Sequence, residues 1–599
     1  MVCTIEFLNS SDITFNTGKR RQTMGFDRTI KIAGEAGQGI QTVGETFCRI
    51  VKDCGLHLFA NQDYMSRVRG GNNSYMIRIS DKQPVSLKQT FDILIPLNAE
   101  SIGLHQEHLA PDGRIITDRK NFNLTDENPA YLDVPIHSIA MEIGGSPKYE
   151  GTVALGVLCG MFSLDADVVG RTLRAEFESK SKDIADKNIA CANKGIENGK
   201  NSPMEIPPGS MQISTQRYLL NGNQSIALGA AYAGCRFYSG YPMTPSTTIM
   251  ETLAGFSLNH PLVVEQAEDE IAAINMIIGA SYAGVRSMTA TSGGGFALMT
   301  EGLSLAAMQE IPVVIVNGQR PGPATGLPTR TEQADLNLVL YAGHGEFTRV
   351  IYTPGTIEEA FELTVKAFDV ADRFQIPVII LSDQYLSDMM YAVDLPQIQG
   401  LQRQRHILSK EESAAITKYQ RYKITDSGIS PRAVPSWIPD VIYADSDEHT
   451  EDGHITEDSA IRTAMVDKRF SKKMAALCKE VIEPVAVNID GAQLILLGFG
   501  STRGVLSDVA TTTTRIKIGA IHFPQVWPFP VESLLALLEK AQGAHVITVE
   551  NNAGAQLAEL IKLMTGAKIN VSILKYDGRP FTIEELSARV EDYWRNYGI

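Results

Sequence analysis

Cysteine and histidine are scarce in this chain of 599 residues, and neither is arranged in a metal-binding pattern. No two cysteines stand in a CxxC spacing, and the 11 histidines form no HExxH motif. Iron–sulfur and structural zinc sites need closely spaced ligands of these kinds. The sequence therefore predicts no metal site on this chain. We expect most of its seven cysteines to be small buried apolar residues: Cys3, Cys48, Cys54, Cys159, Cys191, Cys235 and Cys478.

Long apolar runs and an excess of positive charge are also missing. No apolar stretch approaches the roughly 18 residues that read as a membrane-spanning helix. The opening "MVCTIEFLNSSDITF" has no basic segment followed by an apolar one, as an export signal would. The formal net charge of −15 argues against binding nucleic acid or an anionic membrane through a basic surface. We expect a cytoplasmic protein whose partners are small molecules and other proteins.

What the chain does have is material for several buried cores, since 44% of its residues are hydrophobic. Its length suits about three or four domains, and short apolar strands alternating with amphipathic stretches predict a multidomain α/β fold. Asn, Gly, Pro and Ser concentrate in one stretch, which reads as a linker. The expected division is a tail (1–26), an α/β domain (27–192), the linker (193–216), a second α/β domain (217–395), a polar connector with an acidic, mobile surface (396–488) and a third α/β domain (489–599).

One stretch of the second domain, "VEQAEDEIAAINMIIGASYAG" (264–284), sets four acids before an apolar run. On a helix of about 3.6 residues per turn, Glu270 falls on the same face as Ile271, Ile274, Ile277 and Ile278. The other acids do not: Asp269 points the opposite way, Glu268 falls outside the apolar stripe, and Glu265 belongs to the preceding strand. Acids in a first helical turn can simply complement the helix dipole. A carboxylate on a core-facing position is costly unless something binds it, so Glu270 is a site candidate.

Three motifs of the second domain, taken together, carry a family resemblance. "SGYPMTPST" (239–247), the Glu270 stretch, and the segment from "TATSGGGFALMTEG" to "NGQRPGPATGLPT" (289–329) resemble the α subunit of 2-oxoacid:ferredoxin oxidoreductases. These are thiamine-diphosphate enzymes that oxidise a 2-oxoacid to its acyl-CoA. The resemblance covers nearly the whole chain. "GEAGQGIQTVGE" with "YMSRVRGGNNSYMIRIS" looks like the family's γ domain, fused ahead of α, and "GFGSTRG" with "VENNAGAQLAEL" looks like its transketolase-C-terminal-type domain.

The resemblance implies a role for each matching residue of the second domain, which would be the pyrimidine-binding domain. Glu270 aligns with the catalytic glutamate that hydrogen-bonds N1′ of the cofactor's aminopyrimidine. Thr244 would point its hydroxyl at the 2-oxoacid, and Arg320 would pair with the substrate's C1 carboxylate, for which a planar bidentate cation is suited. Thr329 would add a hydrogen bond. The alternative for Arg320 is a plain surface cation at a strand end.

The other half of such an enzyme is missing from this chain. The family holds Mg²⁺ and the diphosphate with a GDG motif, and no GDG occurs here. The resemblance therefore implies a β subunit that carries GDG, Mg²⁺ and the cysteines of a [4Fe-4S] cluster, shares the thiamine diphosphate, and passes electrons to ferredoxin. We expect an (αβ)₂ heterotetramer.

The Gly-rich turn "GEAGQG" of the first domain has two competing interpretations. In the family this domain is associated with coenzyme A, and Gly37, Gln38 and Gly39, with Arg67 and Arg69, would supply amide donors and cations for CoA phosphates. A dinucleotide loop is the rival, with Asp63 at a distance suited to a ribose contact, but the glycines read GxxGxG and not GxGxxG. A purely structural turn is the third possibility.

The leading hypothesis is the fused γα subunit of a 2-oxoglutarate:ferredoxin oxidoreductase, which makes succinyl-CoA and CO₂ or runs in reverse. Pyruvate and branched-chain 2-oxoacids stay open as substrates, and Arg330 is a candidate for the distal carboxylate of 2-oxoglutarate. Alternatives of a different class are a non-catalytic nucleotide- or CoA-binding scaffold and a dinucleotide oxidoreductase.

Overall fold

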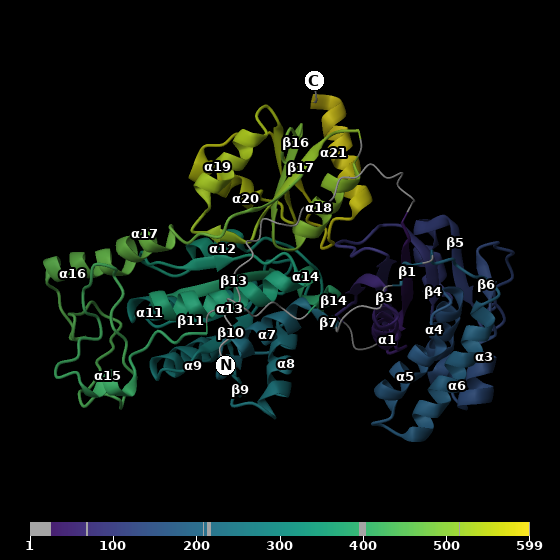
Figure 1. Cartoon of the computed structure of the whole chain (residues 1–599), viewed down its shortest axis with the longest axis horizontal. Coiled ribbons are helices and arrows are strands. Elements are labelled where there is room, and N and C mark those ends of the chain that lie inside the picture. Colours follow the sequence, from purple (N-terminus) through teal and green to yellow (C-terminus); the bar gives the residue numbers. More distant parts are fainter. Residues whose placement is uncertain are drawn as a thin grey trace.

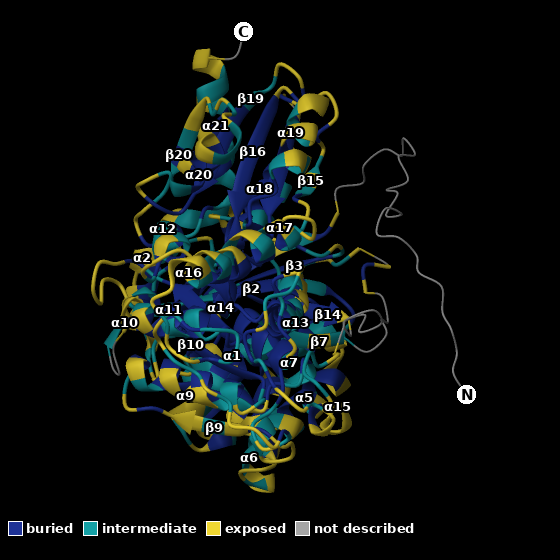
Figure 2. Cartoon of the chain, turned by 90° about the vertical axis from the view of Figure 1, so that its left-hand side faces the viewer, coloured by how far each residue is buried: buried dark blue, intermediate teal, exposed yellow. Residues whose placement is uncertain are grey.

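The computed structural model describes residues 25–66, 70–207, 209–211, 217–394, 403–513 and 515–597. Within them the strands form three sheets, each flanked by helices (Figure 1). The strands at the heart of each sheet are drawn in the colour of buried residues in Figure 2, as β2, β10 and β16 illustrate. The predicted multidomain α/β fold is confirmed.

The first sheet has eight strands and lies at the right of Figure 1. Its order is β6 (Tyr131–Asp133), β5 (Leu109–Thr117), β4 (Phe91–Pro96), β1 (Asp27–Ala36), β3 (Gly70–Ser80), β2 (His57–Asp63), β14 (Met390–Asp394) and β7 (Arg217–Asn221). Its last two strands open and close the segment expected to be the second domain, yet β14 pairs with β2 of the first domain and β7 pairs with β14. The first two α/β units therefore share a sheet, which the sequence pattern does not indicate.

Helices cover the first sheet with a continuous apolar core. The main ones are α1 (Ile40–Asp53), α4 (Glu150–Met161), α5 (Ala166–Phe177) and α6 (Lys182–Gly199), with the short α2 (Glu100–His105) and α3 (Ile136–Ile139) beside them. Helix α6 continues seven residues into the stretch expected to be a linker, because Ile196 and Gly199 pack against α4.

The second sheet holds seven strands, all parallel except the edge strand β18. Its order is β18 (Gln525–Trp527), β12 (Val350–Tyr352), β13 (Pro377–Asp383), β11 (Val313–Gln319), β10 (Ser287–Thr291), β8 (Phe237–Gly240) and β9 (Val263–Gln266). The helices around it are α7 (Gly222–Tyr232), α8 (Thr247–Ser257), α9 (Glu270–Tyr282), α10 (Gly293–Leu298), α11 (Thr300–Met308), α12 (Leu336–Tyr341), α13 (Ile357–Phe374) and α14 (Gln384–Asp388).

The third sheet stands at the top of Figure 1 and has five strands. They run in the order β15 (Val485–Val487), β17 (Ile518–Phe523), β16 (Leu494–Phe499), β19 (His545–Glu550) and β20 (Val571–Leu574). Four helices pack on it: α18 (Arg503–Thr512), α19 (Val531–Lys540), α20 (Gln556–Thr565) and α21 (Ile583–Tyr597). Because β18 leaves this unit to pair with β12, the second and third units are joined through backbone hydrogen bonds.

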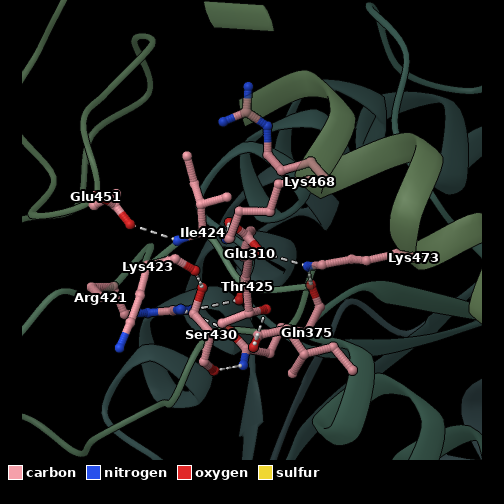
Figure 3. Close-up of polar contacts among 12 residues, drawn as sticks. Glu310, Gln375, Arg421, Lys423, Ile424, Thr425, Ser430, Glu451, Lys468 and Lys473 are labelled. Carbon is pink, nitrogen blue, oxygen red and sulfur yellow. Dashed lines mark hydrogen bonds and ion pairs between the residues drawn. The ribbon is translucent and has the colours of Figure 1, made fainter. Parts of the chain in front are cut away.

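The segment expected to be a polar connector packs against the second unit over residues 403–478. This segment carries α15 (Lys410–Ala414), α16 (Ser459–Val466) and α17 (Lys473–Leu477), and two buried ion clusters fix it to the second unit. Figure 3 shows one of them, in which Glu310 pairs with Lys468 and with Lys473 at 2.6 Å. Burial raises the pKa of Glu310, but the two ammonium groups outweigh it and hold that pKa well below its usual range. Part of the polar composition of this segment therefore reflects internal ion pairs.

The second cluster surrounds Asp372, a buried carboxylate on α13. Arg286 and Arg432 each approach it to 3.2 Å and Arg405 to 3.0 Å. Two of these arginines belong to the connector, so the connector and the second unit share one buried charge network.

Candidate active site

The candidate site lies at the carboxyl edge of the second sheet, where several parallel strands end side by side. Strand β8 leads into the "YPMTP" turn, β9 into α9, β10 into the glycines that begin α10, and β11 into Arg320. All four strands pair in parallel. Ligand sites in open α/β sheets form at this edge.

Glu270 is the one buried acid of its stretch, as predicted. Its side chain is 3% exposed, whereas Glu265 lies on the exposed strand β9 and Glu268 is exposed. Asp269 is the N-cap of α9 and accepts a hydrogen bond from the backbone N–H of Ala272 at 2.7 Å. Glu270 Oε1 has no hydrogen-bond partner among the described residues. A buried, unpartnered carboxylate oxygen fits a site whose hydrogen-bond donor is a ligand.

The prediction that four isoleucines share the buried face of Glu270 is wrong at one position. Ile274, Ile277 and Ile278 are buried, but Ile271 is 49% exposed. Met276, one turn further along α9, is exposed as well. The first turn of the helix therefore has its buried side at Glu270 itself, and an apolar residue next to it faces outward.

The "YPMTP" turn is fixed from three sides. The amide of Asn223 donates to the carbonyl of Pro245 at 2.7 Å, and Ser246 Oγ donates to the carbonyl of Thr291 at 2.6 Å. Gly318 on β11 packs so closely that a β-carbon there would lie 2.8 Å from Ser246 Oγ. Thr244 is half-buried on this turn, so its hydroxyl is held by a rigid backbone.

Arg320 lies next to Thr244, the other residue expected to contact the 2-oxoacid. Its Nη1 donates to the carbonyl of Thr244 at 2.7 Å. Burial lowers the pKa of Arg320, and the nearby Asp335 partly offsets this. Thr329 is buried nine residues further along the loop, and no hydrogen bond between described residues joins it to Thr244 or Glu270. The structure thus groups Thr244 and Arg320, and leaves Thr329 on the loop that leads away from them.

The far end of this loop is held by both other units. Arg330 forms an ion pair with Asp63 of the first unit, and Arg579 of the third unit approaches the same carboxylate to 3.5 Å. Gln333 Nε2 donates to the carbonyl of Phe499 at 2.9 Å. Its backbone N–H donates to the Asn551 carbonyl at 2.6 Å, and its Oε1 accepts from the Asn551 backbone N–H at 3.2 Å. Residues of the "GFGSTRG" and "VENNAG" motifs therefore fix the loop that begins at Arg320 through hydrogen bonds.

These contacts bear on two sequence hypotheses. Asp63, considered for a ribose contact, is engaged by Arg330 and Arg579. Arg330, considered for a distal substrate carboxylate, already has that acid as its partner. Both side chains hold the three units together in this structure.

Asp335 is a partly buried acid that interacts electrostatically with Arg320 and that the sequence did not single out. An Asp before the apolar stretch "LNLVL" reads as an ordinary helix N-cap, and it does occupy the N-cap of α12, but its side chain makes no capping hydrogen bond. Instead Asn317 Nδ2 of β11 donates to Asp335 Oδ2 at 3.3 Å. Burial raises the pKa of Asp335 to about 6. No sequence signal distinguishes this Asp from a helix cap.

The Gly-rich turn of the first unit forms as expected between β1 and α1. Gly37 and Gly39 have φ of 94° and 82°, a left-handed conformation that favours glycine, and a β-carbon at either would meet open space. Gln38 is part of the turn's own bonding: its Oε1 accepts from the backbone N–H of Glu35 at 2.7 Å. Arg67 and Arg69 lie outside the described residues.

Among the described residues, no three or more His, Cys, Asp or Glu side chains form a cluster that could hold a metal ion. Among the described helices, none is both long and apolar enough to cross a membrane.

Comparison with known protein families gives matches in the first and second units. Residues 228–468 match the family described as pyruvate flavodoxin/ferredoxin oxidoreductase, thiamine diphosphate-binding, and residues 29–198 match the pyruvate ferredoxin/flavodoxin oxidoreductase family. A 2-oxoacid:ferredoxin oxidoreductase subunit alpha from Sulfolobus sp. is 32% identical, over 93% of this chain and 95% of that protein. The 2-oxoglutarate oxidoreductase subunit KorA of Mycobacterium tuberculosis is 27% identical, over 96% and 93%.

A solved structure is similar over almost the same length. The 2-oxoglutarate:ferredoxin oxidoreductase from Magnetococcus marinus, with 2-oxoglutarate, coenzyme A and succinyl-CoA bound, superposes with a TM-score of 0.87. It is 30% identical and covers 94% of this chain and 99% of that one. The resemblance read from the motifs is confirmed, and the chain belongs to the alpha subunits of the 2-oxoacid:ferredoxin oxidoreductase family.

Proposed function

We propose that this chain is the thiamine-diphosphate-binding subunit of a 2-oxoglutarate:ferredoxin oxidoreductase, which forms succinyl-CoA and CO₂ and passes two electrons to ferredoxin. The observation that carries the proposal is the buried carboxylate of Glu270, whose Oε1 has no hydrogen-bond partner among the described residues. A carboxylate so placed calls for a donor from a bound group.

Glu270 would hold the proton at N1′ of the cofactor's aminopyrimidine. When bound, thiamine diphosphate supplies the nucleophilic carbon that attacks the keto carbon of the 2-oxoacid. The chain's own contribution is a water-poor position for Glu270, which strengthens its hydrogen bond to the pyrimidine. Asp269 supports this placement by capping α9, so that Glu270 is fixed at the first helical position.

Arg320 and Thr244 would bind the 2-oxoacid end of the substrate. Arg320 presents a partly buried guanidinium that forms no ion pair with another described residue, so it is available to a carboxylate. The hydrogen bond from Arg320 to the Thr244 carbonyl holds the two residues next to each other. Thr329 would contribute from the same loop.

The rest of the catalytic machinery would come from a β subunit that carries the GDG motif, Mg²⁺ and a [4Fe-4S] cluster. Exposed apolar side chains stand on the elements next to Glu270: Tyr241, Ile271, Met276 and Leu298. An apolar surface beside an incomplete site suits a partner subunit. We propose an (αβ)₂ assembly with ferredoxin as acceptor, in the cytoplasm.

Coenzyme A would bind at the first unit. The backbone of Gly37, Gln38 and Gly39 at the start of α1 is open to a phosphate, and Arg67 and Arg69 would add cations. The bound coenzyme A named for the Magnetococcus marinus structure supports a CoA-using reaction.

The choice of 2-oxoglutarate is supported by the names of similar proteins, one of them 27% identical and one 30% identical to this chain. Pyruvate and branched-chain 2-oxoacids are the alternatives, because the ion pair of Arg330 with Asp63 leaves the distal carboxylate without an assigned partner on this chain.

The test is to co-purify the chain with its cluster-bearing partner and to follow ferredoxin reduction with CoA and each 2-oxoacid in turn. Reduction driven by 2-oxoglutarate at the highest kcat/KM supports the proposal, and preference for pyruvate or a branched-chain acid would reassign the substrate. Tightly bound NAD or FAD on the isolated chain would instead support the dinucleotide reading. The ion pairs of Asp63 count against that reading, since they occupy the acid a ribose would need.

A further inference from the structure

Asp335 and Arg320 are oppositely charged residues at the two ends of the loop that borders the candidate site. Among the described residues neither takes part in an ion pair, although Asp335 is the group whose charge favours the protonated form of Arg320. Two opposite charges that are partly buried and not in contact leave both available to a ligand or to a proton.

The surroundings of Asp335 are built to hold a carboxyl group away from the helix it precedes. Asn317 Nδ2 donates to Oδ2 at 3.3 Å, and Gln319 Oε1 accepts from the Asp335 backbone N–H at 3.0 Å. Gly293 gives room, because a β-carbon there would collide with both carboxylate oxygens. The surroundings of this carboxyl group are thus formed by β11 and by Gly293, the first residue of α10.

The charged groups that face Asp335 are few. Among the described residues they are Arg320, which follows β11, and Glu332 of the loop itself, whose pKa is raised by burial and by Asp335. Gly293, the residue of α10 that lies against the carboxylate, carries no charge. A substrate carboxylate that approaches these residues would therefore meet one cation, Arg320, and two acids, Asp335 and Glu332.

We propose that Asp335 is a positioning residue that tunes the carboxylate site at Arg320: it is the countercharge of the guanidinium in the free enzyme, and it takes up a proton from solvent when the carboxylate of the 2-oxoacid binds. The inference rests on the proposed role of Arg320. It names a residue outside the motifs that carry the family resemblance.

The physical reason is repulsion between like charges. A substrate carboxylate on Arg320 disfavours the ionised form of Asp335, so binding and protonation promote each other. Burial already raises the pKa of Asp335 to about 6, so its carboxyl group is close to titrating near neutral pH. The affinity for the 2-oxoacid should therefore rise as pH falls from 8 toward 6.

The experiment uses the complex of this chain with its partner subunit and measures KM for the 2-oxoacid and for CoA between pH 6 and 8. In the wild type we expect KM for the 2-oxoacid to rise about fivefold over this range, a coupling at the low end of those seen between sites, while KM for CoA changes less. In Asp335→Asn the value at pH 8 should be as low as that of the wild type at pH 6, with no slope. Glu332→Gln removes the other acid of the cluster but keeps Asp335, so a pH dependence of KM for the 2-oxoacid should remain in this variant.

A wild-type slope in Asp335→Asn, or a KM raised equally at every pH, would overturn the inference. If that variant does not assemble, calorimetry of the wild-type complex decides. Binding of a 2-hydroxyacid, which cannot be decarboxylated, is measured at pH 7 in two buffers of different ionisation enthalpy. Uptake of part of a proton supports the inference and no uptake sinks it. Absence of 2-oxoacid oxidation in the wild type would instead overturn the proposed function.

Discussion

The carboxylate of Glu270 rests directly against Gly295: a β-carbon on Gly295 would lie 2.5 Å from Glu270 Oε1 and would also collide with Thr291 Oγ1. The neighbouring Gly294 meets nothing within 4 Å. The absence of a side chain at Gly295, in the Gly-rich start of α10, therefore makes room for the buried carboxylate of α9.

Gly295→Ala should displace Glu270 and impair the enzyme more than it unfolds it. Overpacking of a close contact costs about 1–3 kcal/mol, and here the group most able to move is the carboxylate. We expect kcat for 2-oxoacid oxidation to fall at least tenfold while the thermal midpoint drops by a few degrees. Gly294→Ala is the matched control and should be near wild type. Equal effects of the two substitutions would remove the special role of Gly295.

Glu270→Gln should abolish 2-oxoacid decarboxylation in the reconstituted complex and leave assembly intact. An amide is nearly isosteric with the acid but cannot hold the charge that favours the required pyrimidine tautomer. Asp269→Asn is the control, because Asn caps a helix about as well as Asp and would keep the hydrogen bond to Ala272. A Glu270→Gln enzyme within tenfold of wild type would refute the role.

Arg320→Lys and Thr244→Val should each raise KM for the 2-oxoacid more than KM for CoA. Lysine keeps the charge of Arg320 but loses the planar pair of donors, and it would change the hydrogen bond that now reaches the Thr244 carbonyl. The measurement is steady-state kinetics with each substrate varied in turn. Equal changes in the two KM values would assign these residues a structural role.

How far the sequence could lead differs from residue to residue. Glu270 could be found because a helical period of about 3.6 residues places one acid on the core side, a purely local signal. Asp335 could not, because an Asp before an apolar helix has an ordinary explanation as a cap, and only the tertiary contact with Asn317 shows otherwise. The packing of the connector could not be predicted for a similar reason, because a lysine such as Lys468 is usually a surface residue and its partner Glu310 is far away in sequence.

The order of strands in the sheets could not be predicted from the sequence either. Alternation of strands and helices indicates α/β units, and that much was confirmed. The pairing of β14 with β2 joins residues more than three hundred positions apart, and no periodicity encodes which edge strand completes which sheet.

Glu310→Gln should loosen the connector. Removing one partner of a buried ion pair costs about 3–5 kcal/mol, because the remaining charges stay buried, and here Lys468 and Lys473 would both lose their counterion. We expect faster hydrogen exchange and proteolysis within residues 403–478 and a lower thermal midpoint. Glu480→Gln is the control, since the pair of Arg373 with Glu480 is partly exposed and such pairs contribute about 0–1 kcal/mol. Similar losses in both variants would mean that burial of the Glu310 cluster is not what fixes the connector.

Arg67→Ala combined with Arg69→Ala should weaken CoA binding without affecting the early steps of the reaction. If these residues grip CoA phosphates, each charge-assisted hydrogen bond lost is worth on the order of 1.5–3 kcal/mol, so KM for CoA should rise at least tenfold. In the proposed reaction, decarboxylation of the 2-oxoacid and reduction of the proposed β subunit's cluster by the first electron would need no CoA. Stopped-flow cluster reduction without CoA should therefore match the wild type, whereas steady-state formation of the acyl-CoA is impaired. Preserved cluster reduction also serves as the folding control, because a first unit that had come apart would release Asp63 from Arg330 and disturb the loop that begins at Arg320. An unchanged KM for CoA would leave the Gly-rich turn as a structural connection between β1 and α1.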